Sequence, residues 1–179
     1  VGSVSQGLCG SARPGHFRGV ATIVAKLLNI VNPDRLYLGQ KDAQQCVVLR
    51  RMVRDLNIPT RVRVLPTVRE ADGLAKSSRN AYLTAQQRRE APVIYAALCQ
   101  ARQRIQDGER DTARIVQGIR GRIEAESSGR VEYVSCVDEE DLRPLERLSG
   151  RILLAVAVRL GSARLIDNMP INIGLRERG

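Results

Sequence analysis

The chain has 179 residues, 43% of them hydrophobic, which is enough to bury a core in one compact domain or two small ones. Its formal net charge is +10, which suits a polyanionic partner, although an arginine-rich surface without such a partner has the same composition. The sequence contains no apolar run of about 20 residues and no signal-peptide pattern, so we expect a soluble cytoplasmic protein and exclude a membrane partner.

The chain opens with a glycine- and serine-rich stretch, residues 1–15, which we interpret as loop. Apolar side chains then recur every three or four residues from Val20 to Val31, which predicts a helix that opens at His16 and has one apolar face. The Asn-Pro-Asp sequence at 32–34 ends this helix, because proline lacks a backbone donor and restricts the residue before it.

A strand, a helix and a second strand are predicted next, at 36–38, 43–57 and 60–65. The first strand carries no charge, as is typical of a strand covered on both faces, whereas the second alternates apolar residues with arginine. Because a helix between two strands implies a right-handed parallel crossover, we expect residues 17–65 to form part of a doubly wound sheet.

After a loop at 66–80 the pattern changes to two helices followed by strands. Thr84 and Gln87 have the spacing of a capping box, and Pro92 is expected to bend the helix that follows or to mark its true start. Asp111 is predicted to cap the second helix. The predicted strands are 131–137, 151–160 and 163–166.

We therefore expect an α/β chain. Residues 1–66 are predicted to form the second half of a Rossmann-like doubly wound parallel sheet. Residues 67–170 are predicted to form a small α+β domain with an antiparallel sheet, and residues 171–179 a tail, since little pattern is visible after Asn168.

The sequence predicts no metal site of its own. No Cys-x-x-Cys pair occurs, and Cys46, Cys99 and Cys136 lie within apolar segments, so we expect them to be buried free thiols. The acidic run at 139–141 is interpreted as a solvated loop.

Two cationic turns could bind phosphate. At the first, Gly39 would let a ligand approach the backbone, Lys41 would add a positive charge, and Asp42 is a suitable N-cap for the next helix. The second turn is Lys76-Ser77-Ser78-Arg79-Asn80. Two of the three lysines of the chain lie in these turns, although ordinary loops share this composition.

The sequence allows both a ligand-binding and a structural interpretation for three other polar residues. His16, beside Arg13, could contact an anion or anchor a loop. Gln44 and Gln45 could be solvated helix caps, or could bind the hydroxyl and carboxylate of a small polar acid.

Four motifs, in order over residues 13–168, resemble the pantothenate synthetase (pantoate–β-alanine ligase) family. They are Arg13-Pro-Gly-His-Phe-Arg-Gly-Val20, Pro33-Asp-Arg-Leu-Tyr-Leu-Gly-Gln-Lys-Asp-Ala-Gln-Gln45, Pro66-Thr-Val-Arg-Glu-Ala-Asp-Gly-Leu-Ala-Lys-Ser-Ser-Arg-Asn80 and Ala163-Arg-Leu-Ile-Asp-Asn168. The resemblance implies a nucleotidyltransferase-superfamily ligase that uses ATP and Mg2+ to adenylate pantoate. The β-alanine amine then displaces AMP. It also implies small-molecule partners, no nucleic acid, and a homodimer in the full-length enzyme.

The resemblance also implies roles for individual residues. Gln45 would bind pantoate, Arg13 and His16 would line the cleft, and Val68 would meet the adenine through its backbone. The residues expected to contact ATP are Gly39, Gln40, Lys41, Asp42, Val68, Lys76, Ser77, Ser78 and Arg79. Among these, Lys41, Ser77 and Arg79 would stabilise the charge that develops in the transition state.

Two departures from the family pattern qualify the resemblance. Position 76 is usually apolar in the family, so Lys76 either adds a phosphate contact or faces solvent. The chain also lacks the family's His-x-Gly-His signature, whose histidine is assigned as the catalytic acid, and the early residues expected to hold pantoate and Mg2+. We therefore expect a carboxyl-terminal portion of the enzyme that is inactive alone. A basic nucleic-acid-binding module and a regulatory or assembly domain that has lost catalysis stay open as alternatives.

Overall fold

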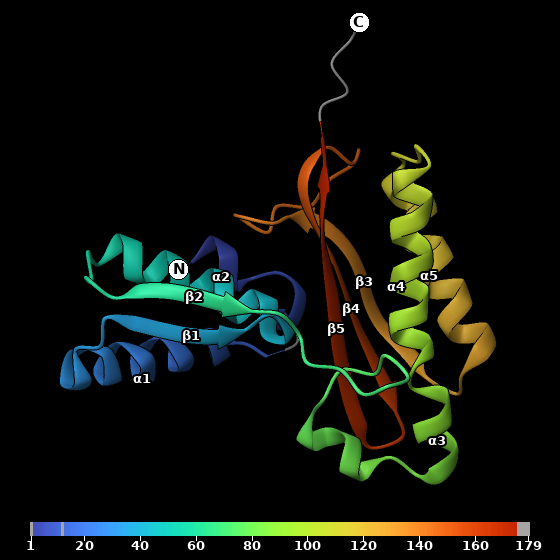
Figure 1. The fold of residues 1–179 in the computed structure, drawn as a ribbon, viewed down its shortest axis with the longest axis horizontal. Coiled ribbons are helices and arrows are strands. Elements are labelled where there is room, and N and C mark those ends of the chain that lie inside the picture. Colours follow the sequence, from blue (N-terminus) through green and yellow to red (C-terminus); the bar gives the residue numbers. More distant parts are fainter. Residues whose placement is uncertain (1, 12, 175–179) are drawn as a thin grey trace, which may run out of the picture. The chain divides into compact units, whose positions relative to one another are not determined.

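The computed structural model describes residues 2–11 and 13–174, which fall into two compact units (Figure 1). The first unit comprises Val1–Thr67 with Glu140–Leu142, and the second comprises Val68–Glu139 with Arg143–Gly179. The elements of the first unit are η1 (Ser3–Ser5), η2 (Leu8–Gly10), α1 (His16–Val31), β1 (Arg35–Gly39), η3 (Gln40–Asp42), α2 (Ala43–Asp55) and β2 (Arg61–Leu65). Those of the second are η4 (Ser78–Tyr82), α3 (Ala85–Glu90), α4 (Val93–Gln106), α5 (Thr112–Glu126), β3 (Arg130–Asp138), β4 (Gly150–Leu160) and β5 (Ala163–Ile173).

The first unit is built on a parallel pair of strands, as the crossover rule predicts. β1 and β2 pair in register from Arg35 opposite Arg61 to Gly39 opposite Leu65. Helices α1 and α2 pack together on the face that carries Leu36, and Leu28 and Leu49 are almost fully buried there. The predicted α-β-α-β order is therefore confirmed.

Coverage of this small sheet differs from the prediction. Among the described residues only one face of the sheet is covered, because both helices pack on the side of Leu36 and Leu38. On the other face Tyr37 is 55% exposed, so the expectation that the first strand is covered on both faces is wrong within this chain. The apolar face of α1 is likewise only partly buried, with Ile23 58% and Ile30 76% exposed.

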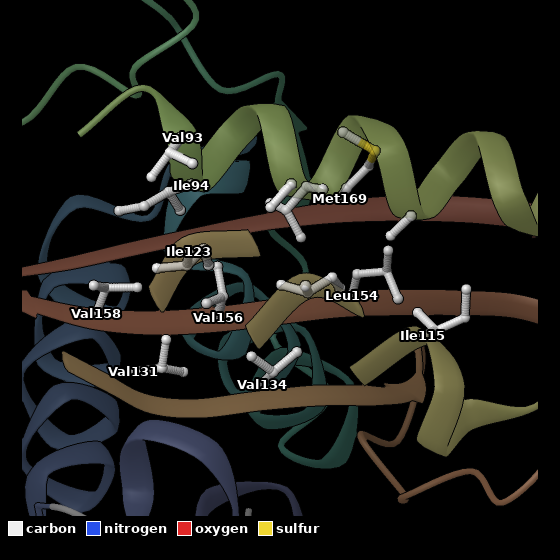
Figure 2. Packing of buried hydrophobic residues seen from close by; sticks show 14 of the residues in the cluster. Val93, Ile94, Ile115, Ile123, Val131, Val134, Leu154, Val156, Val158 and Met169 are labelled. Carbon is white, nitrogen blue, oxygen red and sulfur yellow. The ribbon is translucent and has the colours of Figure 1, made fainter. Parts of the chain in front are cut away.

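The second unit packs helices α4 and α5 against an antiparallel sheet in the order β3-β4-β5. Figure 2 shows the valines and isoleucines of both layers meeting between the helices and the strands. Ile115, Ile119 and Ile123 recur every four residues on α5 and are each at most 1% exposed, so this helix turns one apolar stripe to the sheet. The mixed α/β class, with one parallel and one separate antiparallel sheet, is therefore confirmed.

The predicted helix ends of the second unit are also confirmed. The Thr84 hydroxyl accepts from the Gln87 amide at 3.2 Å and the Gln87 side chain accepts from the Thr84 amide at 3.0 Å, which completes the capping box. Asp111 accepts from the Arg114 amide at 3.1 Å. Pro92 marks the true start of α4 rather than a bend within one helix.

The last strand is longer than predicted. β5 continues through Ile173 and pairs with β4 as far as Gly150, so the expected patternless tail after Asn168 is wrong for residues 169–173. Buried side chains alternate there with exposed Pro170, which is tolerated because β5 lies at the sheet edge. Residues 175–179 of the expected tail lie outside the described part of the chain.

Candidate functional site

The glycine turn of the first unit has open space before it. Gly39 ends β1 with φ −87° and ψ 131°, a conformation that any residue adopts. A Cβ built at Gly39 would meet no described atom within 4 Å. Since neither the backbone nor the packing of this chain requires a glycine here, the open backbone leaves room for a ligand to approach closely.

A buried thiol fastens this turn to helix α2. The Cys46 sulfhydryl donates to the Gly39 carbonyl at 3.3 Å, and Cys46 is 3% exposed. Burial raises the pKa of Cys46 to about 11, so the thiol keeps its proton, and its role as donor, at neutral pH. The sequence pattern predicts the burial of Cys46 but not this contact. Cys136 is buried as predicted, whereas Cys99 is only half-buried, and all four cysteines are free thiols.

Lys41 and Asp42 lie side by side at the start of α2. Their Nζ and Oδ1 atoms are 3.9 Å apart, with the lysine side chain 17% and the aspartate side chain 51% exposed. Asp42 occupies the N-cap position, as predicted, but its side chain makes no capping hydrogen bond. The predicted capping bond is therefore wrong, and the carboxylate instead partly balances the charge of Lys41. Gln40 belongs to the same single turn, η3.

Gln44 has a structural role that the sequence did not reveal. Its side chain is 7% exposed and holds the segment 4–9: Nε2 donates to the Val4 carbonyl at 3.1 Å and to the Gly7 carbonyl at 2.7 Å, while Oε1 accepts from the Cys9 amide at 3.0 Å. The expected loop at 1–15 is thus ordered in its described part, as η1 and η2. Gln45, the predicted pantoate residue, is half-buried next to Gln44 on the first turn of α2.

Arg13 and His16 follow the segment that Gln44 holds. Gly10 fits closely there, because a Cβ at this position would collide with the Ser5 carbonyl. The Arg13 amide donates to the Gly10 carbonyl at 3.3 Å, and the His16 amide donates to the Arg13 carbonyl at 3.1 Å. The His16 ring lies 5.0 Å from the ring of Phe17, which packs with α2 residues. These contacts connect His16, through Phe17, to Val47 and Val48 of α2.

The candidate residues of the second unit lie on a hairpin and the turn after it. The Lys76 amide donates to the Val68 carbonyl at 2.9 Å, and Arg69 pairs with Ala75 in an antiparallel bridge. The structure thus brings together Val68 and Lys76, which are eight positions apart in the sequence. Val68 is 65% exposed.

The phosphate-loop candidates follow directly on this hairpin. Ser77 is the N-cap of η4, and its hydroxyl accepts from the Arg79 amide at 3.2 Å, while Ser78 and Arg79 are exposed. Asn80 donates to the Ala75 carbonyl at 3.1 Å, which fixes the base of the turn. Lys76 faces solvent beside an acidic neighbour, with Nζ 3.8 Å from Glu70 Oε2 and its side chain 55% exposed.

The candidate residues therefore form two groups, one in each compact unit. Gly39 to Gln45, with Arg13 and His16, belong to the first unit, and Val68 with Lys76 to Arg79 belongs to the second. Within residues 2–11 and 13–174, no cluster of three or more histidine, cysteine, aspartate or glutamate side chains is arranged to hold a metal ion. No helix of that same part of the chain is long and apolar enough to cross a membrane.

A parallel strand–turn–helix with an open glycine, followed by a separate antiparallel unit with a serine- and arginine-bearing turn, defines the chain as an α/β protein of Rossmann-like type. The family model for pantoate-beta-alanine ligase matches residues 1–170, and the chain belongs to this family.

Individual relatives agree with this assignment. The chain is 55% identical over 173 residues to pantothenate synthetase of Heliobacterium modesticaldum, covering 97% of this chain and 62% of the relative. It is also 55% identical over 166 residues to pantothenate synthetase of Geobacillus kaustophilus, covering 93% of this chain and 55% of the relative. The chain therefore spans about three fifths of the length of these relatives.

Solved structures show the same relation. Pantothenate synthetase from Thermus thermophilus superimposes with a TM-score of 0.90 at 44% identity, over 94% of this chain and 61% of that one. Pantoate-beta-alanine ligase from Francisella tularensis, complexed with beta-gamma ATP and beta-alanine, gives a TM-score of 0.69 at 35% identity. This superposition covers 93% of this chain and 54% of that one.

Proposed function

We propose that this chain is the nucleotide-binding portion of an ATP-dependent ligase that condenses pantoate and β-alanine through a pantoyl-adenylate. Within this family, the observation that carries the proposal is the open backbone of Gly39, two residues before Lys41, whose side chain is largely shielded from solvent. An anion at this turn would meet both a closely approachable backbone and a positive charge.

The reaction needs activation because a carboxylate is a poor electrophile, and the adenylate supplies a good leaving group. Transfer of the nucleotidyl group depends mainly on positioning and on neutralising the charge that spreads over the phosphates. In our proposal Lys41, Ser77 and Arg79 neutralise that charge. Val68 meets the adenine, and Gln45 binds pantoate.

The remaining ATP contacts are proposed from Gly39, Gln40 and Asp42 in the first unit and from Lys76 and Ser78 in the second. Arg13 and His16 would line the cleft. The described residues offer no acidic cluster for Mg2+, so we propose that the metal is held mainly by ATP and by parts of the full-length enzyme that this chain does not span. The full-length enzyme is proposed to be a homodimer.

The chain spans about three fifths of its relatives, and we propose that it binds ATP but has negligible ligase activity alone. Isothermal titration of the purified chain with Mg-ATP tests the first part. Binding should weaken at least ~10-fold in Lys41→Ala, which removes a charge-assisted contact, and should stay unchanged in Lys26→Ala, which removes an exposed lysine from α1.

Two further measurements separate the alternatives. AMP release with pantoate, β-alanine and Mg-ATP at the rate of a complete enzyme would contradict the proposed inactivity. Tight DNA binding with a steep salt dependence, unchanged in Lys41→Ala, would instead favour a nucleic-acid-binding module.

A further inference from the structure

A partly buried ion pair joins the hairpin of the second unit, residues 68–76, to its sheet. Arg69 Nη1 lies 2.6 Å from Asp167 Oδ2, and Nη2 lies 2.9 Å from Oδ1, so the guanidinium and the carboxylate pair through two parallel hydrogen bonds. The side chains are 18% and 5% exposed. The pair joins residues that are 98 positions apart and connects the hairpin directly to β5.

Neighbouring groups make further contacts with both members of this pair. Arg69 Nη1 also donates to the Gly73 carbonyl at 3.0 Å, and the guanidinium carbon lies 3.7 Å from the centre of the Tyr95 ring. Asp167 Oδ1 also accepts from the Asn168 amide at 2.8 Å. Burying two charges is costly unless both are well paired, and replacing such a pair by apolar residues is often neutral, so its contribution to stability alone is a weak reason for this arrangement.

The tip of the hairpin is fixed at a second point. Gly73 has φ +90°, which favours glycine, and a Cβ there would come within 2.5 Å of the Tyr95 ring. The hairpin is thus joined to β5 through Arg69, and Gly73 packs closely against Tyr95 of α4. At the base of the hairpin the Lys76 amide donates to the Val68 carbonyl, so the start of the serine turn is tied to Val68.

We propose that Arg69, held by Asp167, is a positioning residue that fixes the distance between the adenine contact at Val68 and the phosphate contacts at Ser77 to Arg79. This inference rests on the proposed function, since it takes ATP as the ligand. Arg69 touches neither adenine nor phosphate in this account. It keeps the hairpin in the one arrangement in which both ends of a nucleotide can be held at once.

The test compares two ligands that share phosphates but differ in the adenosine. Mg-ATP and Mg-tripolyphosphate are each titrated into the 179-residue chain and into Arg69→Lys, which keeps the charge but loses the paired hydrogen bonds. The expected result is that the ratio of the ATP affinity to the tripolyphosphate affinity falls ~10-fold in Arg69→Lys. An equal loss for both ligands, or no loss, overturns the positioning role.

A second variant and a control keep the test decisive. Asp167→Asn should lower the same ratio, and it stands in if Arg69→Lys does not fold. The matched control is Arg122→Lys on α5, which removes a guanidinium whose hydrogen bonds go to α4 and to Glu126 of its own helix. This control should leave the ratio unchanged.

Failure of the proposed function gives a different signature. If the unchanged chain binds neither ATP nor tripolyphosphate at millimolar concentration, the proposed function itself is contradicted, and the positioning role falls with it. If the unchanged chain prefers ATP and both variants keep that preference, only the positioning role is overturned.

Discussion

Replacing Gly39 by alanine distinguishes an effect on folding stability from an effect on ligand binding. The backbone of Gly39 has φ −87° and ψ 131°, which alanine adopts without strain, and the added Cβ meets no described atom within 4 Å. Gly39→Ala should therefore change the free energy of unfolding by less than about 1 kcal/mol, in the stabilising direction, because alanine restricts the unfolded chain.

The effect on ligand binding should be opposite. A methyl group placed in the open space before Gly39 prevents a phosphate from approaching the backbone and Lys41 together. We expect Mg-ATP to bind at least ~10-fold more weakly, a loss of about 1.4 kcal/mol. Isothermal titration measures the affinity, and urea unfolding measures the stability of the same samples.

The matched control is Gly19→Ala within α1. A Cβ at Gly19 also meets nothing within 4 Å among the described atoms, and the position lies in a helix, where alanine is favoured by about 1 kcal/mol. This variant should be more stable and should bind ATP unchanged. If Gly39→Ala binds ATP as tightly as the original chain, close approach of a ligand to this backbone is refuted. If Gly39→Ala unfolds, the description of the turn is wrong.

Further predictions concern the interior. Gln44→Ala leaves three backbone groups without their partner, so it should cost about 1–3 kcal/mol and speed hydrogen exchange in residues 4–9; equal exchange in Gln44→Ala and the control Gln45→Ala would contradict this. Because burial raises the pKa of Cys46 from 9.0 to about 11, the folded chain keeps a proton that the unfolded chain loses. The free energy of unfolding should therefore fall between about pH 9 and pH 11, and it should fall less steeply in Cys46→Ala. If urea unfolding at a series of pH values gives the same decrease in free energy for both proteins, this prediction is refuted. Ile119→Ala removes buried carbons at a site 1% exposed and should cost about 2–5 kcal/mol, against about 0.5–1.5 for Ile119→Val; equal losses in urea unfolding would contradict close packing there.

Local signals in the sequence were sufficient to predict most of the helices and strands. The four-residue spacing of Ile115, Ile119 and Ile123 reports the helical period directly, and the Thr84–Gln87 capping box is a contact between neighbours in the chain. The far end of β5 escaped prediction because Pro170 interrupts the pattern of a strand, and only its place at the edge of the sheet makes it acceptable.

Contacts between distant residues could not be predicted from the sequence. Gln44 reaches the carbonyl of Val4, 40 residues away, and Arg69 reaches Asp167, 98 residues away. Neither contact leaves a periodic or local mark in the sequence. The ATP and pantoate roles came from family motifs rather than from spacing, and they stay predictions for Lys41 and Gln45.

The central proposal is that the turn from Gly39 to Lys41 binds the phosphates of ATP. Hydrogen exchange of the 179-residue chain with and without saturating Mg-ATP tests it most directly. We predict that ATP slows exchange at 39–45, and that Lys41→Ala abolishes this protection. Exchange at 39–45 that ATP leaves unchanged, or protection there that survives in Lys41→Ala, would contradict the proposal.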